Sequence, residues 1–221
     1  MIIITGASDG LGRELAKLYQ MQGTGVVNIS RRECEFAKVN ILADLTRVED
    51  INRVAKQISD MSDKVTALIN CIGVWGEESI EDMSEAETDI LLATNIKAPM
   101  LLISRLINRI KDDKSDVVNV ISTAGLKGNK DHMAYAASKW GERGFTEALR
   151  SELNDTESRV ISFYPGGMKT KFFEKNLGED ITDDGTYWMD PASVALCLKQ
   201  LLDLPKNIEV SEITLNRKKS K

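Results

Sequence analysis

The chain has 221 residues, of which 42% are hydrophobic and 29% charged, and its net charge is −5. This length and balance allow a buried core, and they exclude a disordered, collagen-like or disulfide-stapled protein. The acidic charge disfavours bulk attraction to nucleic acid or to an anionic membrane, so we expect neither as a partner.

The sequence shows no run of about 20 apolar residues that could span a bilayer, and no basic and apolar leader precedes Ile2. The three cysteines are widely spaced without a CxxC pair, and the chain has a single histidine. We therefore expect no membrane-spanning helix, no signal peptide, no metal site, and a reducing, cytoplasmic location.

Short β-branched runs alternate along the chain with longer segments of helical period. Most of these runs are continuously apolar, which is typical of strands buried on both faces. The pattern predicts an α/β fold, a Rossmann-like doubly wound parallel sheet of about seven strands with helices on both faces. The predicted strands are Ile2–Ile4, Val26–Ser30, Val39–Leu42, Ala67–Asn70, Val117–Ser122, Val160–Tyr164 and Glu209–Leu215.

The predicted helices are Leu11–Gln22, Val48–Met61, Ser84–Ile110 with a break near Pro99, Met133–Asn154 and Pro191–Leu204. Only eight residues separate Ser30 from Val39, too few for a crossover helix, so a loop is expected there. No linker divides the chain. We expect one domain over residues 1–215, followed by a basic, solvated and disordered tail over residues 216–221.

The first predicted strand leads through Thr5–Gly12, with the sequence TGASDGLG, into a predicted helix. Gly6 permits a tight turn, Gly10 lets the backbone approach a pyrophosphate, and Gly12 lets the helix pack closely on the sheet. The alternative is a glycine turn with a purely structural role. The strand before and the helix after the loop favour dinucleotide binding, with Gly6, Ser8, Asp9, Gly10, Leu11 and Gly12 against the cofactor.

The second predicted strand ends in Ser30, followed by Arg31 and Arg32. A domain that binds NAD usually has an acidic residue here for the ribose hydroxyls. A small hydroxyl beside a guanidinium suits a 2′-phosphate instead, because Arg can bind it through two hydrogen bonds. The alternative is that the two arginines are only solvated. We expect NADP(H) rather than NAD(H).

Tyr135 and Lys139 lie four residues apart near the start of a predicted helix and therefore share one face. A nearby ammonium favours the phenolate, so Lys139 is expected to lower the pKa of Tyr135 toward the working pH of a general acid. Ser122 ends a predicted buried strand, where open α/β sheets bind their ligands. Each residue alone is commonly a packing or capping residue.

Together these motifs resemble the short-chain dehydrogenase/reductase family over nearly the whole chain. The Thr5–Gly12 loop resembles its TGxxxGxG motif, Asn70–Gly73 its NNAG motif and Pro165–Thr170 its PGxVxT motif, while Asp44 stands where the family has an Asp near the adenine. The resemblance adds to the expected cofactor site Asp44, Leu45, Asn70, Gly73, Pro165, Gly166, Met168 and Thr170, together with Tyr135 and Lys139. It also implies the catalytic tetrad Asn95, Ser122, Tyr135 and Lys139.

The resemblance implies an NADP(H)-dependent oxidoreductase that reduces a ketone or aldehyde, or catalyses the reverse reaction, with Tyr135 as general acid or base. By the same resemblance, Ser122 orients the carbonyl oxygen, Lys139 binds the nicotinamide ribose, and Asn95 holds a water for proton resupply. The expected partners are a small-molecule carbonyl or alcohol and further copies of the chain in a homodimer or homotetramer. A non-catalytic NADP(H)-binding sensor or scaffold, and an epimerase or dehydratase of nucleotide-sugars, are the alternatives.

Some features depart from the family pattern or stay open. Cys71 and Ile72 replace the second Asn and the Ala of NNAG. The segment from Lys171 to Met189, where the family forms its substrate lid, is compact; Phe172, Phe173, Tyr187 and Trp188 there either line an apolar pocket or anchor the lid. We expect His132 to be a surface residue rather than a second acid. The acidic run from Glu77 to Glu87 is expected to be a solvated start of a helix, not a metal site.

Overall fold

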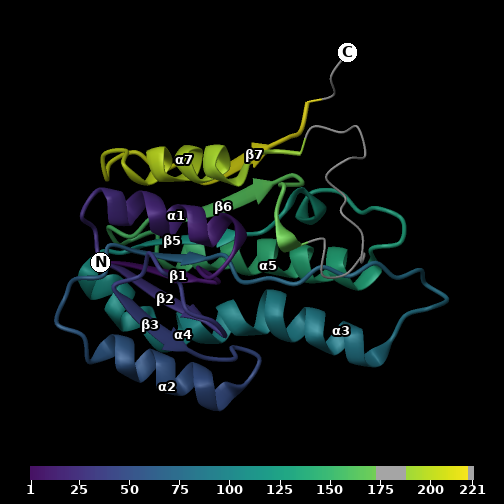
Figure 1. Cartoon of the computed structure of the whole chain (residues 1–221), viewed down its shortest axis with the longest axis horizontal. Coiled ribbons are helices and arrows are strands. Elements are labelled where there is room, and N and C mark those ends of the chain that lie inside the picture. The colour runs from purple at the N-terminus through teal and green to yellow at the C-terminus, as the bar shows by residue number, and fades with distance from the viewer. Residues whose placement is uncertain (173–187, 219–221) are drawn as a thin grey trace.

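The computed structural model describes residues 1–172 and 188–218. Its sheet has seven parallel strands in the order β3-β2-β1-β4-β5-β6-β7 (Figure 1). This order confirms the predicted doubly wound sheet. It also places the topological switch point between β1 and β4, where open α/β sheets bind ligands. The strands are β1 (Ile2–Thr5), β2 (Val26–Ser30), β3 (Val39–Leu42), β4 (Ala67–Asn70), β5 (Asp116–Val120), β6 (Val160–Pro165) and β7 (Glu212–Leu215).

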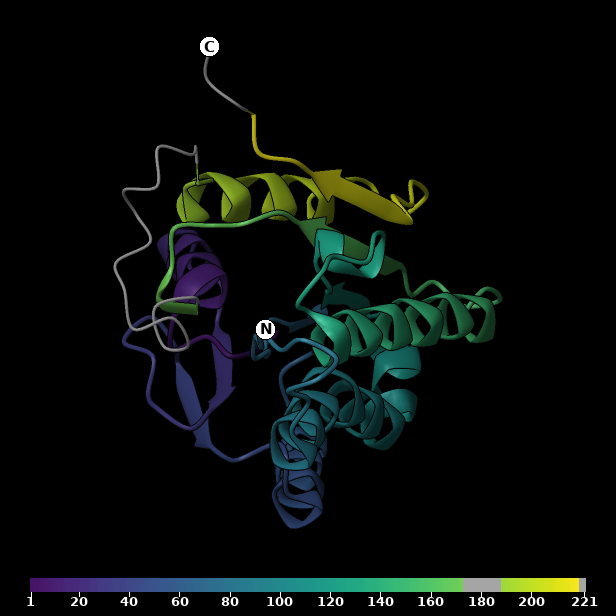
Figure 2. The same cartoon turned by 90° about the vertical axis from the view of Figure 1, so that its right-hand side faces the viewer.

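Helices cover both faces of the sheet, as Figures 1 and 2 show. On one face α1 (Gly10–Met21) packs beside α7 (Pro191–Leu202), and on the other lie α2 (Val48–Ser59), α4 (Ala98–Asp113) and α5 (Met133–Glu152). The short helix α3 (Glu85–Leu92) packs against α5. Residues 31–38, between β2 and β3, form the predicted loop without a helix.

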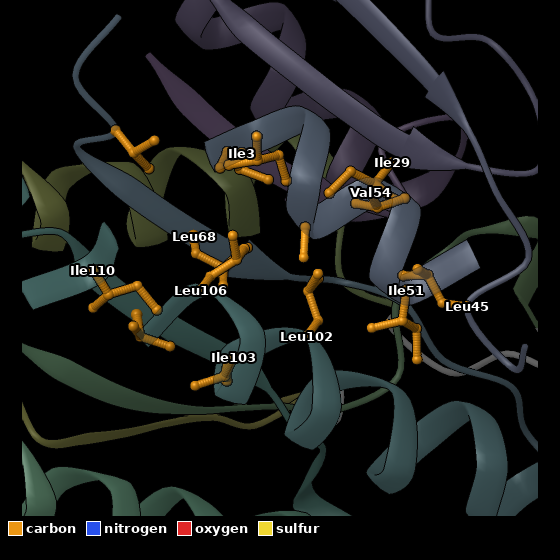
Figure 3. Packing of buried hydrophobic residues seen from close by; sticks show 14 of the residues in the cluster. Ile3, Ile29, Leu45, Ile51, Val54, Leu68, Leu102, Ile103, Leu106 and Ile110 are labelled. Carbon is orange, nitrogen blue, oxygen red and sulfur yellow. The ribbon is translucent and has the colours of Figure 1, made fainter. Parts of the chain in front are cut away.

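The central strands send alternate side chains into two separate hydrophobic clusters. Ile3 and Leu68 pack with α2 and α4 in the larger cluster (Figure 3), whereas Ile4 and Ile69 pack with α1 and α7 in the other. Continuous apolar runs are therefore required, because both pleat faces of these strands are buried. The clusters fix the sheet, and thereby the loops at its carboxyl edge, as a rigid support.

The predicted break near Pro99 is wrong. The chain stays helical from Glu85 to Asp113, with a π-helical segment at Ala93–Lys97 between α3 and α4. Pro99 lies in the first turn of α4, where its missing N–H disrupts least. The π-helical segment just before Pro99 has a wider turn and carries Asn95. Such segments often occur at functional sites.

Among the described residues, the continuous helix Glu85–Asp113 is the one segment long and apolar enough to cross a membrane, judged by length and composition alone. Core helices of soluble α/β proteins meet the same criterion. Leu102, Leu106 and Ile110 of this helix are buried against the sheet (Figure 3). Packing inside the protein therefore accounts for its apolar side.

Most other boundaries agree with the prediction within two residues, but the last strand begins at Glu212 instead of Glu209. The fifth strand ends at Val120, so Ser122 lies just beyond it rather than in it. The Ser122 hydroxyl accepts a hydrogen bond from the Ala124 backbone N–H and caps a 3-10 turn at Thr123–Gly125. This turn ends the strand and leaves Ser122 at the carboxyl edge of the sheet.

Candidate active site

A cavity of about 460 Å³ opens at the carboxyl edge of the sheet, at the switch point. Both groups of residues expected at the site, the cofactor loop and the Tyr135–Lys139 pair, form its wall. The expected site residues that line it are Gly6, Ser8, Asp9, Gly10, Leu11, Gly12, Ser30, Arg31, Arg32, Asp44, Leu45, Gly73, Ser122, Tyr135, Lys139, Pro165, Gly166, Met168 and Thr170. The other two, Asn70 and Asn95, are buried behind the wall.

The glycine loop has the geometry of a phosphate cradle. Gly6 and Gly10 adopt left-handed backbone angles, with φ of 74° and 52°, which side chains disfavour. A Cβ on Gly12 would lie 2.6 Å from the Gly6 carbonyl oxygen, so only glycine lets α1 begin this close to the loop. The cavity wall thus presents backbone and a helix N-terminus, and these residues fit the pyrophosphate of a dinucleotide.

The two arginines after β2 have different surroundings. A nitrogen of the Arg32 guanidinium lies 3.1 Å from an Asp9 carboxylate oxygen, and Asp9 also caps α1 by accepting from the Gly10 N–H. Arg31 forms no ion pair with any residue that the structure describes. The Ser30 hydroxyl lies 2.6 Å from the Arg32 carbonyl oxygen, to which it donates, and so stabilises the turn that carries both arginines.

Helix α5 places Tyr135 and Lys139 one turn apart on the side of the cavity. The pKa of Tyr135 is raised, chiefly because the residue is buried; the Lys139 ammonium and a hydrogen bond with Ser122 lower it, and Glu142 raises it further. Lys139 therefore acts on the pKa of Tyr135 in the predicted direction, but burial outweighs it and the net shift is upward. Burial outweighs the ammonium because desolvation penalises the phenolate.

Glu142 is a residue at this site that sequence reasoning missed. The Lys139 ammonium donates to Glu142 Oε2 at 2.7 Å, and the two side chains are only 2% and 1% exposed. The signal was available, since Glu142 stands three residues after Lys139 and seven after Tyr135. Those spacings place all three on one helix face.

The two asparagines have positional roles in this structure. The Asn95 amide oxygen accepts from the Val74 N–H at 2.8 Å, and its nitrogen donates to the Val74 carbonyl at 2.9 Å and to Ser138 Oγ at 3.0 Å. Asn95 thereby ties the loop after β4 to α5. Asn70 donates to Asn119, which donates to Thr146 of α5, so a buried polar chain links two central strands to the same helix.

Of the aromatic residues expected at the lid, Phe172 lines the cavity. Trp188 packs against Gly167, and the Arg217 guanidinium lies 4.5 Å from the centre of its ring, so a residue of the predicted tail contacts the lid. Phe173 and Tyr187 lie outside the described residues.

Within the described part of the chain, no group of three or more metal-ligating side chains comes together. The acidic run is not wholly solvated as predicted, because Glu78 is buried. Its contact with Glu87, and then burial, raise the pKa of its carboxyl. His132 lies outside the cavity wall, half-buried beside Trp75, with its Nδ1 3.3 Å from the Gly76 carbonyl oxygen.

The fold and this crevice define a Rossmann-like protein built to hold a dinucleotide. A family model described as short chain dehydrogenase matches residues 1–180. The chain belongs to the short-chain dehydrogenase/reductase family and is an oxidoreductase of that family. This membership confirms the resemblance seen in the motifs.

Two relatives show how similar the chain is in sequence to other oxidoreductases. The chain is 24% identical to an uncharacterized oxidoreductase of Staphylococcus saprophyticus, covering 96% of this chain and 95% of the relative. It is 31% identical to dehydrogenase/reductase SDR family member 7B of Xenopus tropicalis, covering 84% of this chain and 65% of the relative. A short-chain dehydrogenase/reductase from Vibrio parahaemolyticus, known from a crystal structure, is 26% identical in sequence. The match has a TM-score of 0.85 and covers 99% of this chain and 100% of that chain.

Two further solved structures share the fold and carry different cofactors. Serine dehydrogenase complexed with NADP⁺ has a TM-score of 0.85 at 22% identity, covering 97% of this chain and 94% of that one. A 4-hydroxyisoleucine dehydrogenase complexed with NADH and succinate has a TM-score of 0.81 at 23% identity, covering 97% of each chain. Proteins of this fold are therefore found with either dinucleotide.

Proposed function

We propose that this chain is an NADP(H)-dependent oxidoreductase that reduces a ketone or aldehyde to an alcohol, or catalyses the reverse reaction. One observation carries the proposal. Ser122, Tyr135 and Lys139 line the same cavity as the glycine loop at the N-terminus of α1. A proton donor and a dinucleotide site in one crevice suit hydride transfer to a carbonyl.

The bound nicotinamide would supply or accept the hydride. Tyr135 donates its phenolic proton to the carbonyl oxygen as that oxygen gains charge, and Ser122 donates a hydrogen bond that orients the same oxygen. Lys139 lowers the cost of forming the phenolate, and it can donate to the ribose hydroxyls that a dinucleotide would bring into the cavity. Asn95 contributes by holding the loop after β4 and Ser138 of α5 together.

The alternative function is a sensor or scaffold that binds NADP(H) without turnover. Such a protein has no use for a buried phenol paired with a serine and a lysine, which favours the enzyme. A screen that follows NADPH oxidation over chemically diverse ketones and aldehydes tests the proposal. Turnover with any of them supports the enzyme, whereas tight NADPH binding without turnover across the screen supports the sensor.

The preference for NADP(H) rests on Arg31, because Arg32 is already paired with Asp9. Replacing Arg31 with Ala removes a charge-assisted contact to the 2′-phosphate worth about 1.5–3 kcal/mol, or roughly 10- to 150-fold in affinity. We expect NADPH binding to weaken by that factor and NADH binding to stay unchanged. Fluorescence titration with each dinucleotide measures both.

Arg32→Ala is the matched control, and we expect it to have the smaller effect on NADPH. If Arg31→Ala weakens the binding of NADPH and of NADH equally, Arg31 supports the loop and does not contact the 2′-phosphate. If only Arg32→Ala weakens NADPH, then Asp9 gives up its partner on cofactor binding and the assignment passes to Arg32.

The assembly that we propose is a homodimer or homotetramer formed through α4 and α5. Trp140 of α5 and Met100 of α4 are large apolar side chains that remain exposed on these helices. Covering such residues is favourable at about 25 cal/mol per Å² of apolar surface removed from water. Sedimentation velocity of the purified chain should show a dimer or tetramer, and Trp140→Glu should shift the population toward monomer.

Cys34, Cys71 and Cys197 are free thiols, which suits the proposed cytoplasmic location.

A further inference from the structure

The Lys139–Glu142 ion pair lies directly behind the proposed proton donor. It is one of two ion pairs among the described residues in which both side chains are less than 5% exposed; the other, Arg159–Asp116, is remote from the cavity. A buried ion pair gains little stability over an apolar pair of the same size, because desolvating both charges offsets their attraction. Folding stability therefore does not explain why an ion pair is buried at this position.

The pair restricts what the lysine can do. An ammonium has three N–H donors. One points to Glu142 Oε2 at 2.7 Å, and the Val120 carbonyl oxygen of β5 lies 3.4 Å from the same nitrogen. At most two donors remain for Tyr135 and a ribose. The carboxylate thus anchors the ammonium and leaves its remaining donors for the cavity side.

We propose that Glu142 is a positioning residue that anchors the Lys139 ammonium and keeps the Tyr135–Lys139 couple in its proton-donating form, biasing the enzyme toward carbonyl reduction. This inference rests on the proposed function for the direction of the reaction. The anchoring and the charge effect on Tyr135 do not depend on it.

The direction of the effect follows from charge. Tyr135 and Lys139 each act on the pKa of the other, so we consider the two side chains together as a couple. The fully protonated couple carries one positive charge more than the form that has lost a proton. A fixed negative charge beside the couple stabilises the protonated form, whichever residue releases the proton first.

The titratable groups around the couple agree with this direction. Burial lowers the pKa of Lys139, but Glu142 and then Tyr135 outweigh it, so the pKa is raised. Glu142 also raises the pKa of Tyr135. The loop after β4 also faces the pair. Burial raises the pKa of its Cys71 thiol to about 12, so this thiol stays neutral. Among the described residues, Glu142 is therefore the carboxylate that acts on the couple; burial raises its own pKa, and the ion pair with Lys139 opposes that rise and favours the charged carboxylate.

The consequence concerns the direction of the reaction. Reduction needs Tyr135 protonated, and alcohol oxidation needs it deprotonated. By moving the proton loss of the couple to higher pH, Glu142 extends the pH range in which Tyr135 is an acid and narrows the range in which it is a base.

The test is a titration of the cofactor-free protein labelled with [¹³Cζ]tyrosine, which needs no substrate. The chain has four tyrosines, and Tyr135→Phe identifies the Tyr135 resonance. In the unmodified protein this resonance should keep its phenol position to above the ordinary tyrosine pKa. In Glu142→Gln the midpoint should fall by about one to three pH units, the usual effect of one close charge.

Glu147→Gln is the matched control, because it removes the same charge from an exposed position of the same helix, where Glu147 pairs with Arg143. It should leave the Tyr135 midpoint in place. Glu142→Val removes the charge with an apolar side chain in case Gln does not fold, and should lower the midpoint likewise. Glu142→Asp keeps a carboxylate one carbon further back, and should cause a smaller shift in the same direction.

A Tyr135 midpoint that stays in place or rises in the folded Glu142 variants overturns the proposal, and so does an equal shift in Glu147→Gln. These outcomes are independent of the proposed activity, which could still be found in the carbonyl screen. With a substrate in hand, the alkaline limb of the reduction rate should move to lower pH in Glu142→Gln by the same amount. An unmoved limb overturns the bias toward reduction while leaving the anchoring role.

Discussion

Replacing Tyr135 with Phe is expected to lower kcat by about 10²–10⁴ while leaving NADPH affinity unchanged. The change deletes one hydroxyl from a buried ring on α5 and leaves the glycine loop intact. What is lost is the proton donor, and general acid catalysis is typically worth about 10²–10⁴ in rate. Turnover on a substrate from the carbonyl screen and NADPH fluorescence titration measure the two effects separately.

Tyr19→Phe is a suitable control, because its phenol is buried between α1 and α7, away from the cavity. It should leave both turnover and NADPH binding intact. Near-normal turnover in Tyr135→Phe on a true substrate would mean that another group donates the proton, and the central part of the proposed mechanism would fail.

The architecture could be predicted from the sequence because it rests on local patterns. A run such as Ile2–Ile4 is apolar at every position, and the structure buries its two pleat faces in two different clusters. The glycine loop is equally local, since the left-handed angles of Gly6 and Gly10 arise within the turn itself. Patterns of this kind need no knowledge of distant residues.

The parts that escaped prediction depend on contacts between distant segments. Pro99 lies in a continuous helix, in the first turn of α4 and directly after a π-helical segment. The sign of the Tyr135 pKa shift depends on how deeply the packed chain buries α5, which spacing along the helix does not reveal. Glu142 shares a helix face with Tyr135 and Lys139, yet a Glu on a helix is usually solvated, and only the packed structure shows it buried beside the lysine.

Replacing Lys139 with Met is expected to damage both binding and turnover, in contrast to Tyr135→Phe. The variant loses the donor to the nicotinamide ribose, worth about 1.5–3 kcal/mol, so NADPH affinity should fall roughly 10- to 150-fold. It also loses the charge that favours the phenolate. A rise of about one to three units in the pKa of Tyr135 makes it a weaker acid, and with a Brønsted coefficient of about one half it should slow the chemical step by roughly 3- to 30-fold.

The Lys139→Met variant also leaves the Glu142 carboxylate buried without its partner, which should lower stability by about 3–5 kcal/mol. The double variant Lys139→Met, Glu142→Gln removes that unpaired charge, so it should regain stability in denaturant unfolding but recover neither NADPH affinity nor turnover. Recovery of turnover in the double variant would show that the single variant failed because of the unpaired carboxylate. Lys139 would then have no direct part in catalysis, and the Tyr135–Lys139 couple would have to be abandoned.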